Sequence, residues 1–334
     1  MKAVVQDRYG PPDDVLKLRE IDIPAIGDDQ VLVRVRATSV HPDVWHDVTG
    51  LPYLMRLGNG LRRPKERIQG SDLAGQVESI GKNVTRFQAG DEVFGWSSTQ
   101  LFGHGGTFAE YAAVSQDVLA LKPPNVTFEQ AAAVPTSGYF AVVCLRLGGE
   151  LKGRHVLLNG AGGCLGSIAI QMAKAEGARV TGVDCAEKLA MIRALGADDV
   201  IDYAREDFLQ RSERYDFVLD ITSTRKFKDC KRVLTPTGLF WHSGHGQYGE
   251  SGRILGSTFP HDASFFVGFL FDRHVPRFRF KFPSKQDTMA VLKGLLESGK
   301  LAPIIGRTFP LSEVPAAIRC LKEGRTPGRI MITP

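Results

Sequence analysis

A strand-like apolar run that enters a cluster of glycines constrains this chain most. Residues 155–159 are His-Val-Leu-Leu-Asn, and residues 160–166 are Gly-Ala-Gly-Gly-Cys-Leu-Gly. Helical apolar spacing follows from Ser167 to Gly177, and then a second strand is expected over residues 179–183. Glycines permit a tight turn and a close approach of a ligand, and the start of the following helix presents free N–H groups to an anion. The unit therefore predicts a pyrophosphate site, with an ordinary glycine-rich turn as the alternative.

The residue after the second strand extends this prediction to a dinucleotide. Asp184 lies 18 residues after Gly166, near the distance expected for an acid that binds a ribose. A carboxylate there accepts hydrogen bonds from both ribose hydroxyls and repels a 2′-phosphate. Lys188, one helical turn further on, could partly offset that repulsion. We therefore predict NAD as the cofactor, with NADP as the alternative; if Asp184 only caps the next helix, the preference stays open.

Composition excludes several other classes of protein. The 334 residues suggest two domains, and 43% hydrophobic with 24% charged residues is typical of a globular protein. A net charge of +5 is too small and too dispersed to indicate nucleic-acid binding. No apolar run reaches the length of a membrane span, and residues 1–5 are expected to form a first strand rather than a signal-peptide core. The five cysteines are scattered without a CxxC motif, which favours reduced thiols in a cytoplasm over a disulfide framework or a structural zinc.

The N-terminal third is expected to be rich in β-strands. Short β-branched or alternating runs predict strands over residues 2–6, 31–38, 75–80, 92–95 and 107–114. A helix is expected over residues 127–147, with Thr127 as its cap and with a break at Pro135 and Gly138.

The remainder alternates strands and helices. Strands are expected over residues 199–202, 215–220, 238–242 and 329–333, and helices over 187–195, 226–234, 287–298 and 313–322. This alternation predicts an α/β fold with a doubly wound parallel sheet. Within residues 244–286, the aromatic run 265–271 is expected to be a buried strand or short helix at a domain or subunit contact rather than the wall of an apolar substrate pocket.

An ordered set of short motifs along nearly the whole chain resembles the medium-chain dehydrogenase/reductase superfamily, in its zinc-free quinone oxidoreductase-like branch. The motifs occupy residues 36–43, 70–77, 90–95, 106–111, 131–135, 195–198 and 326–330, together with the glycine loop, in which Ala161, Gly163 and Gly166 match the AxGxxG pattern of that branch. The resemblance implies a GroES-like β domain from residues 1–124 and 263–334, with a Rossmann NAD(P)-binding domain inserted over residues 125–262. It also implies an active-site cleft between the domains and, commonly, a homodimer.

The zinc ligands of related enzymes are absent here. Zinc-dependent relatives have Cys at the position of His41, Gly-His-Glu at residues 70–72, and a four-Cys lobe near residues 95–115, where this chain has no cysteine. A new ligand set of His41, Asp43 and His46 is conceivable but disfavoured, since Pro42 and the expected turn oppose their convergence; the alternative for His46 is a surface-loop residue. We therefore expect no metal. Conjugated acceptors need only a hydrogen-bond donor near the carbonyl oxygen, and the resemblance also implies a zinc-independent NAD(P)H-dependent oxidoreductase that transfers hydride to a quinone or an α,β-unsaturated carbonyl.

His41 and Tyr53 are the candidate catalytic residues. Family members often have Asn at the position of His41 and a Tyr near the position of Tyr53. Phe140 stands where relatives usually place a Thr beside the nicotinamide, so Thr136 or Ser137 could supply that hydroxyl.

The candidate cofactor-binding residues lie in the glycine loop and at the carboxyl ends of the predicted strands, where doubly wound sheets bind ligands. They are Thr136, Gly160, Ala161, Gly162, Gly163, Cys164, Leu165, Asp184, Lys188, Tyr203, Thr222, Ser243 and Gly244.

Other interpretations remain open at this point. The departures at His41 and Phe140 are also compatible with a nucleotide-binding structural or sensor protein without turnover, and an alcohol dehydrogenase with atypical metal ligands is a third possibility. The basic run from Arg56 to Arg67 is expected to be a solvated loop whose apolar residues Leu54, Met55, Leu57 and Leu61 anchor it, rather than a surface for an acidic substrate or a membrane.

Overall fold

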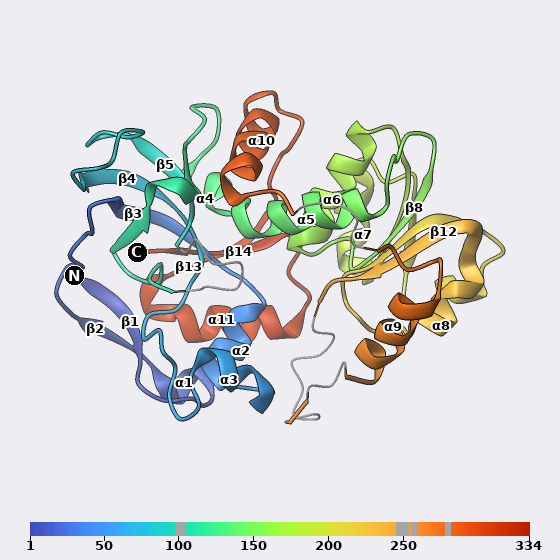
Figure 1. Cartoon of the computed structure of the whole chain (residues 1–334), viewed down its shortest axis with the longest axis horizontal. Helices are drawn as coiled ribbons and strands as arrows, with labels where there is room; N and C mark the ends of the chain where they lie inside the picture. The colour runs from blue at the N-terminus through green and yellow to red at the C-terminus, as the bar shows by residue number, and fades with distance from the viewer. Residues whose placement is uncertain (98–104, 245–253, 256–258, 278–281) are drawn as a thin grey trace. The chain divides into compact units, whose positions relative to one another are not determined.

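The chain forms two compact units in a computed structural model that describes residues 1–97, 105–244, 254–255, 259–277 and 282–334 (Figure 1). The first unit comprises Met1–Tyr139 and Ser284–Pro334, and the second comprises Phe140–Pro283. The sequence had suggested boundaries after residues 124 and 262. They fall later because α4 (Phe128–Ala132) packs on strands of the first unit, and α9 (Phe259–Phe271) packs on α8 (Phe227–Cys230) of the second.

The first unit is built on a seven-stranded sheet to which both ends of the chain contribute. The strand order is β13-β14-β3-β4-β5-β7, with β6 paired to β3. β14 pairs antiparallel with β3, with Ile330 opposite Val40, so the last strand of the chain completes a sheet begun near its start. The strands are β3 (Gln30–Val40), β4 (Asp72–Ile80), β5 (Glu92–Trp96), β6 (Tyr111–Ser115), β7 (Leu119–Leu121), β13 (Ile305–Pro310) and β14 (Arg329–Thr333). A separate antiparallel pair joins β1 (Lys2–Gln6) to β2 (Leu16–Glu20).

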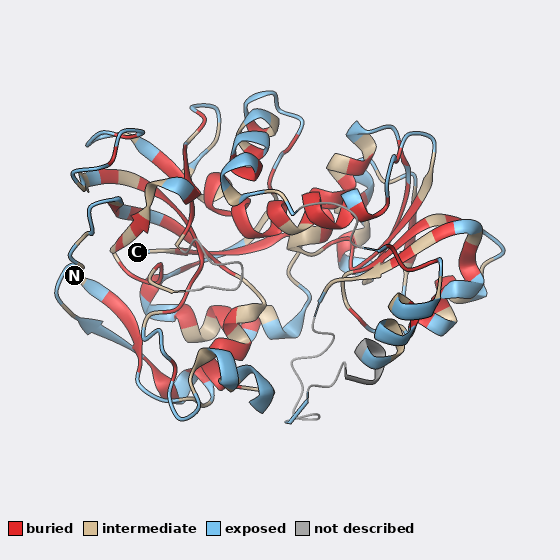
Figure 2. Cartoon of the chain, viewed as in Figure 1, coloured by how far each residue is buried: buried red, intermediate tan, exposed pale blue. Residues whose placement is uncertain are grey.

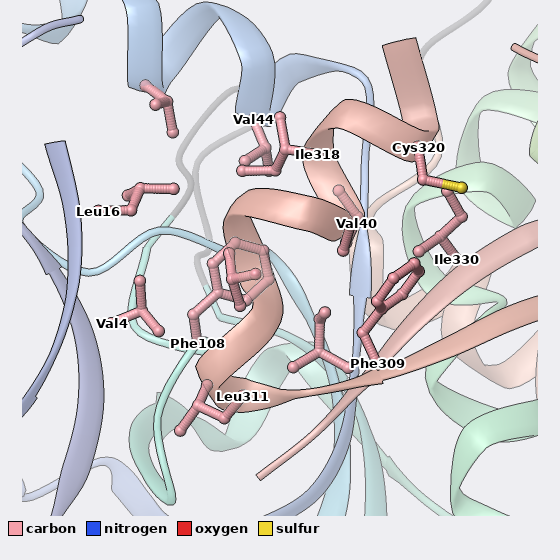
Figure 3. Packing of buried hydrophobic residues seen from close by; sticks show 14 of the residues in the cluster. Val4, Leu16, Val40, Val44, Phe108, Phe309, Leu311, Ile318, Cys320 and Ile330 are labelled. Carbon is pink, nitrogen blue, oxygen red and sulfur yellow. The ribbon is translucent and has the colours of Figure 1, made fainter. Parts of the chain in front are cut away.

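An amphipathic helix closes the core of this unit. α11 (Val314–Glu323) places Val314, Ala317 and Ile318 at i, i+3 and i+4, all with no exposed surface, and ends at Gly324 in the left-handed conformation. These side chains belong to one apolar cluster with residues of β3, β14 and α2 (Asp43–Thr49), and Figure 3 shows Ile318 in it together with Val40, Val44 and Ile330. The other helices here are α1 (Pro12–Val15), α3 (Arg56–Asn59) and α10 (Lys285–Glu297).

The second unit contains a five-stranded parallel sheet in the order β10-β9-β8-β11-β12. The order reverses beside β8, between β8 and β11, which makes that edge the topological switch point where such sheets bind ligands. The strands are β8 (His155–Asn159), β9 (Arg179–Asp184), β10 (Asp199–Asp202), β11 (Tyr215–Asp220) and β12 (Leu234–His242). Figure 2 shows much of this sheet in the buried colour, as expected of a sheet covered on both faces. The predicted α/β fold with a doubly wound parallel sheet is confirmed.

The break predicted within residues 127–147 occurs where proline requires it. α4 ends at Ala132 and α5 (Pro135–Leu147) begins with Pro135, a position at which a missing N–H costs nothing. Gly138 does not interrupt α5. A Cβ there would lie 2.6 Å from the Leu292 side chain, so this glycine instead permits close packing of α5 on α10. The single helix expected over residues 226–234 is in fact α8 followed by a 3₁₀ turn, Lys231–Val233.

The aromatic run 265–271 lies in a helix with one face packed on the core and the other exposed in the single chain, and its expected place at a domain or subunit contact stays a prediction. The run lies in α9, where Phe265 and Phe269 pack on the core of the second unit and Gly268 is buried. Phe266, Val267, Leu270 and Phe271 are exposed, because a helix that covers one side of a sheet turns its other face outward. Much of the surrounding segment 244–286 lies outside the described residues.

None of the helices in the described parts of the chain is long and apolar enough to cross a membrane.

Candidate active site

The glycine loop joins β8 to α6 (Cys164–Ala175) as the sequence predicted. Gly160 adopts φ +92°, a conformation that favours glycine, and Gly163 is the N-cap of α6. A Cβ on Gly166 would lie 2.3 Å from the Gly160 carbonyl oxygen, so the first turn of α6 is pressed against the loop. Cys164 and Leu165 open the helix, and their N–H groups lack partners within the helix. The loop has the strand–turn–helix form that accommodates a pyrophosphate.

Asp184 and Lys188 form a buried ion pair beside this loop. The Asp184 carboxylate accepts hydrogen bonds from the N–H groups of Gly162 at 2.8 Å and Cys185 at 2.9 Å, and the Lys188 Nζ lies 3.2 Å away. Both side chains are less than 10% exposed. The carboxylate therefore ties the end of β9 to the glycine loop, and the ammonium balances its charge. α7 (Ala186–Ala194) has Cys185 as its N-cap with no side-chain cap bond, so Asp184 does not cap that helix.

Tyr203 lies at the same edge of the sheet, directly after β10. Its N–H donates to the Asp184 carbonyl at 3.2 Å, while its side chain is exposed. This placement agrees with a ring that flanks the adenine.

The ends of β8 and β11 are joined by a polar network that the sequence analysis only partly found. The Asn159 amide donates to Asp220 at 2.8 Å and to the Thr222 hydroxyl at 2.9 Å, and Thr222 donates to Asp220 at 2.9 Å. A Cβ on Gly160 would lie 2.8 Å from the Thr222 methyl group, so Thr222 borders the glycine loop. Asn159 was not singled out, although a polar residue that ends an apolar strand was the available signal. Ser223 adopts φ +51°, which is unusual for a residue with a side chain and marks local backbone strain at the switch point.

Ser243 and Gly244 follow β12 and contact the same network. The Ser243 N–H donates to the Asp220 carbonyl at 3.0 Å, and the Ser223 hydroxyl donates to the Gly244 carbonyl at 2.9 Å. The structure thus brings Asp184, Tyr203, Thr222, Ser243 and Gly244 to the carboxyl edge of one sheet, together with the glycine loop. Thr136 belongs to the first unit.

The first unit holds a buried polar network around Asp72, the first residue of β4. Asp72 has no exposed surface and forms an ion pair with Arg329 of β14, which is 1% exposed. It also accepts hydrogen bonds from the Ser39 hydroxyl at 2.6 Å and the Thr136 N–H at 3.0 Å. Ion pairing and hydrogen bonds together compensate the burial of this charge.

Thr136 links Asp72 to Trp96. Its hydroxyl donates to Asp72 at 2.5 Å and accepts the indole N–H of Trp96 at 3.0 Å, and Thr136 itself is 4% exposed. Arg329 also donates to the Ser137 hydroxyl at 3.0 Å. Both hydroxyls that the sequence analysis offered to the nicotinamide therefore already hold this network. The Ser71 hydroxyl is buried and has no hydrogen-bond partner in the part of the chain that the structure describes.

The two candidate catalytic residues lie in different surroundings within the first unit. His41 follows β3, with its Nδ1 3.1 Å from a carboxylate oxygen of Asp43, and both side chains are mostly buried. Tyr53 is 45% exposed, and its ring stacks on the Arg56 guanidinium at 4.6 Å. A shared catalytic role for His41 and Tyr53 stays a prediction.

His46 is not the surface-loop residue that the sequence suggested. It lies in α2 and is 7% exposed, and its Nδ1 lies 2.5 Å from the Leu51 carbonyl, which requires Nδ1 to carry the proton. Among the described residues, no three His, Cys, Asp or Glu side chains come together as a metal-binding group, so His41, Asp43 and His46 are not brought together as ligands.

The loop around α3 also differs from expectation. Leu54, Met55, Leu57 and Leu61 were expected to anchor it, but all four side chains are at least 40% exposed. The helical and 3₁₀ turns of this segment direct them away from the core of the unit, which a pattern of apolar residues alone could not show.

Comparison with known proteins agrees with this architecture. Residues 27–124 match the family model described as alcohol dehydrogenase GroES-like domain, and residues 195–332 match the one described as zinc-binding dehydrogenase. The glycine loop falls between the two matched ranges, so its interpretation as a dinucleotide-binding loop rests on the geometry described above.

Similar proteins cover the whole chain. The 2-methylene-furan-3-one reductase of Solanum lycopersicum is 31% identical over 347 residues, covering 100% of this chain and 79% of the relative. The chloroplastic NADPH-dependent alkenal/one oxidoreductase of Arabidopsis thaliana is 33% identical over 348 residues, covering 100% of this chain and 80% of the relative. Among solved structures, the quinone oxidoreductase from Coxiella burnetii has a TM-score of 0.82 and 28% identity, covering 100% of this chain and 99% of that one.

A GroES-like unit and a parallel nucleotide-binding sheet on one chain define the class of medium-chain dehydrogenases and reductases. This chain belongs to that superfamily, in its zinc-free quinone oxidoreductase-like branch.

Proposed function

We propose that this protein is a zinc-independent NAD(P)H-dependent oxidoreductase that transfers hydride to a quinone or an α,β-unsaturated carbonyl. The observation that carries this proposal is the presence, in one chain, of a dinucleotide-type glycine loop and of a polar network around Asp72, in the segment where zinc-dependent relatives hold metal ligands. The names of the relatives, which include an alkenal/one oxidoreductase and a quinone oxidoreductase, support the same acceptor class.

The chemistry divides between the cofactor and the chain. A bound reduced nicotinamide cofactor supplies the hydride. The N–H groups of the glycine loop and the start of α6 would hold its pyrophosphate, and the residues at the carboxyl edge of the sheet would orient it. Reduction of a conjugated acceptor places charge on the carbonyl oxygen, so a donor in the first unit lowers the barrier by stabilising that charge.

His41 is the first candidate for this donor. The Nδ1 of its imidazole lies 3.1 Å from the Asp43 carboxylate, and such a partner holds the ring in one orientation. Tyr53 is the second candidate, and its exposed phenol could meet an acceptor directly.

The test is NAD(P)H oxidation by the purified protein with a panel of enones and quinones, repeated with His41→Ala and His41→Asn. We expect turnover with at least one conjugated acceptor. His41→Ala should lower kcat by about 10-fold to 100-fold, since a single oriented donor is lost. His41→Asn, which keeps a hydrogen-bond donor at this position, should retain most of the wild-type kcat. Turnover unchanged in His41→Ala would remove His41 from the mechanism and leave Tyr53→Phe as the next variant.

The cofactor is proposed to be NAD, with NADP also accepted. Asp184 disfavours a 2′-phosphate, as the sequence suggested, but its ion pair with Lys188 supports a much weaker preference than an isolated carboxylate would give. The relative in Arabidopsis thaliana is named NADPH-dependent, which supports NADP as an accepted cofactor.

A homodimer and a cytoplasmic location are likewise proposed. The dimer rests on the resemblance of the chain to its superfamily, and light scattering of the purified protein tests it. The location rests on the scattered cysteines.

A further inference from the structure

A lysine at the start of α10 lies against the polar network of the first unit. Lys285 is the first residue of that helix, after the N-cap Ser284, and its side chain is half-buried. The Nζ lies 5.1 Å from the centroid of the Trp96 ring. The same indole donates to Thr136, whose hydroxyl donates to Asp72.

This is a costly place for a positive charge. The N-terminus of a helix carries a partial positive charge, so a cation at the first position is disfavoured, and α10 otherwise follows the usual rule by placing Asp287 in its first turn. Burial adds to the cost and lowers the pKa of Lys285 to about 8, although the carboxylate of Asp72 acts in the opposite direction. A residue that breaks local rules of helix electrostatics in this way is typical of a functional site.

A second feature, beside Asp72 in the sequence, suggests a ligand. Ser71, the neighbour of Asp72, keeps a buried hydroxyl without a hydrogen-bond partner among the described residues. Buried polar groups usually find a partner, so an unsatisfied one indicates a site for an atom from outside the chain. The carboxylate of Asp72 thus acts on a proton-bearing cation, and the next residue toward the N-terminus keeps an unsatisfied hydroxyl.

We propose that the Lys285 ammonium is the proton donor for acceptor reduction in this protein, an inference that rests on the proposed function. Hydride addition to the β-carbon of an enone leaves an electron pair shared between the α-carbon and the oxygen. An N–H bond of Lys285 breaks, the proton joins that electron pair at carbon or oxygen, and the lysine is left as a neutral amine. Water returns a proton to the amine before the next turnover.

The surroundings fix the sign of the pH dependence. Asp72 is the charged group that acts on Lys285, and it is paired with Arg329. Other charged groups on neighbouring elements include Asp117 on the 3₁₀ turn that α10 contacts and Asp287 on α10 itself. Only the protonated lysine donates, so kcat should be level below pH 8 and fall about tenfold per pH unit above it.

The test compares Lys285→Met and Lys285→Arg with Lys293→Met, a control on the same helix that removes a lysine paired to Glu297. At pH 7 and saturating cofactor, both Lys285 variants should lose about 100-fold or more in kcat on an enone, and the fall near pH 8 should disappear. Arginine keeps the charge but does not deprotonate in this range, so a Lys285→Arg protein with normal kcat would overturn proton donation. Lys293→Met should behave as wild type.

Thermal stability shows whether a Lys285 variant has lost activity because it is misfolded. The proposal predicts that removing Lys285 lowers kcat but does not lower stability. The unfolded chain, with an ordinary lysine pKa of 10.5, binds this proton more tightly than the folded chain. The buried charge therefore opposes folding below about pH 8, and the penalty fades as pH rises from about 8 to 10.5. Lys285→Met should consequently unfold at no lower a temperature than wild type at pH 7. A large fall in Tm would instead assign Lys285 a structural role and contradict the proposal.

A direct titration separates this inference from the proposed function. In lysine-labelled protein, one side-chain resonance should titrate near pH 8 and be absent from Lys285→Met. A lysine that titrates only above pH 10 contradicts the proposal whether or not turnover is found. If the wild type turns over and Lys285→Met is equally active, proton donation by Lys285 is contradicted and the proposed oxidoreductase function stands. If the wild type is inactive with every acceptor, the proposed function itself is contradicted.

Discussion

At the scale of single residues, the buried pair of Asp184 and Lys188 is the determinant that we propose for the choice between NAD and NADP. The isolated carboxylate would exclude a 2′-phosphate, and the ammonium 3.2 Å away offsets that exclusion. Discrimination between NADH and NADPH should therefore be modest, within about tenfold, or about 1.4 kcal/mol.

Removing the lysine should expose the carboxylate. We expect Lys188→Met to weaken NADPH binding by about tenfold or more and to change NADH binding far less, as measured by fluorescence titration. Because a buried charge without its partner destabilises a fold, the matched control is the neutral double variant Asp184→Asn/Lys188→Met. Equal weakening of both cofactors by Lys188→Met would show that the pair only supports the loop.

The two lysines of interest also show what sequence reasoning can reach at this scale. Lys188 follows Asp184 by one helical turn, so its influence could be predicted from spacing. Lys285 could not be found in the same way. The helix was expected to begin at Asp287, and the partners of Lys285, Trp96 and Asp72, lie far away in the chain. Only the tertiary structure brings them together.

At the scale of elements, we propose that the glycine loop and α6 bind the nucleotide. Gly163 and Gly166 have different roles within this unit. A Cβ on Gly166 would lie 2.3 Å from the Gly160 carbonyl oxygen, whereas the nearest atom to one on Gly163 is 3.5 Å away. One glycine is therefore needed for packing, and the other leaves space where a ligand can approach.

Alanine substitutions should separate these roles. Gly166→Ala should destabilise the protein by about 1–3 kcal/mol through overpacking. Gly163→Ala should cost less than about 1 kcal/mol of stability yet weaken cofactor binding at least tenfold, because its methyl group enters the space for the pyrophosphate. Thermal unfolding and cofactor titration measure the two effects, with Gly294→Ala, in open space on α10, as the control. Normal cofactor affinity in Gly163→Ala would place the pyrophosphate elsewhere.

Elements with strong local signals were predicted well, and those set by packing were not. The strands β1, β10, β11 and β14 match their predicted ranges because apolar runs bounded by turn residues define them. The exposed face of α9 and the burial of His46 depend on which neighbour each helix finds, and periodicity within a segment does not contain that information.

At the scale of the whole molecule, the chain combines a nucleotide-binding sheet with a β unit made from both of its ends. That organisation could be predicted because the family motifs are spread along nearly the whole sequence. The compact units nevertheless divide the chain about fifteen to twenty residues later than expected, since the packing of α4 and α9 rather than local composition determines where each unit ends.

The most direct test of the central claim follows the transferred hydrogen. Wild-type protein is incubated with NADH or NADPH deuterated at C4 of the nicotinamide and with an α,β-unsaturated ketone, and the product is analysed by NMR. The account predicts one deuterium at the β-carbon of the saturated ketone and a solvent-derived hydrogen at the α-carbon. Cofactor that binds without turnover, or a product that carries no deuterium from the nicotinamide, would contradict it.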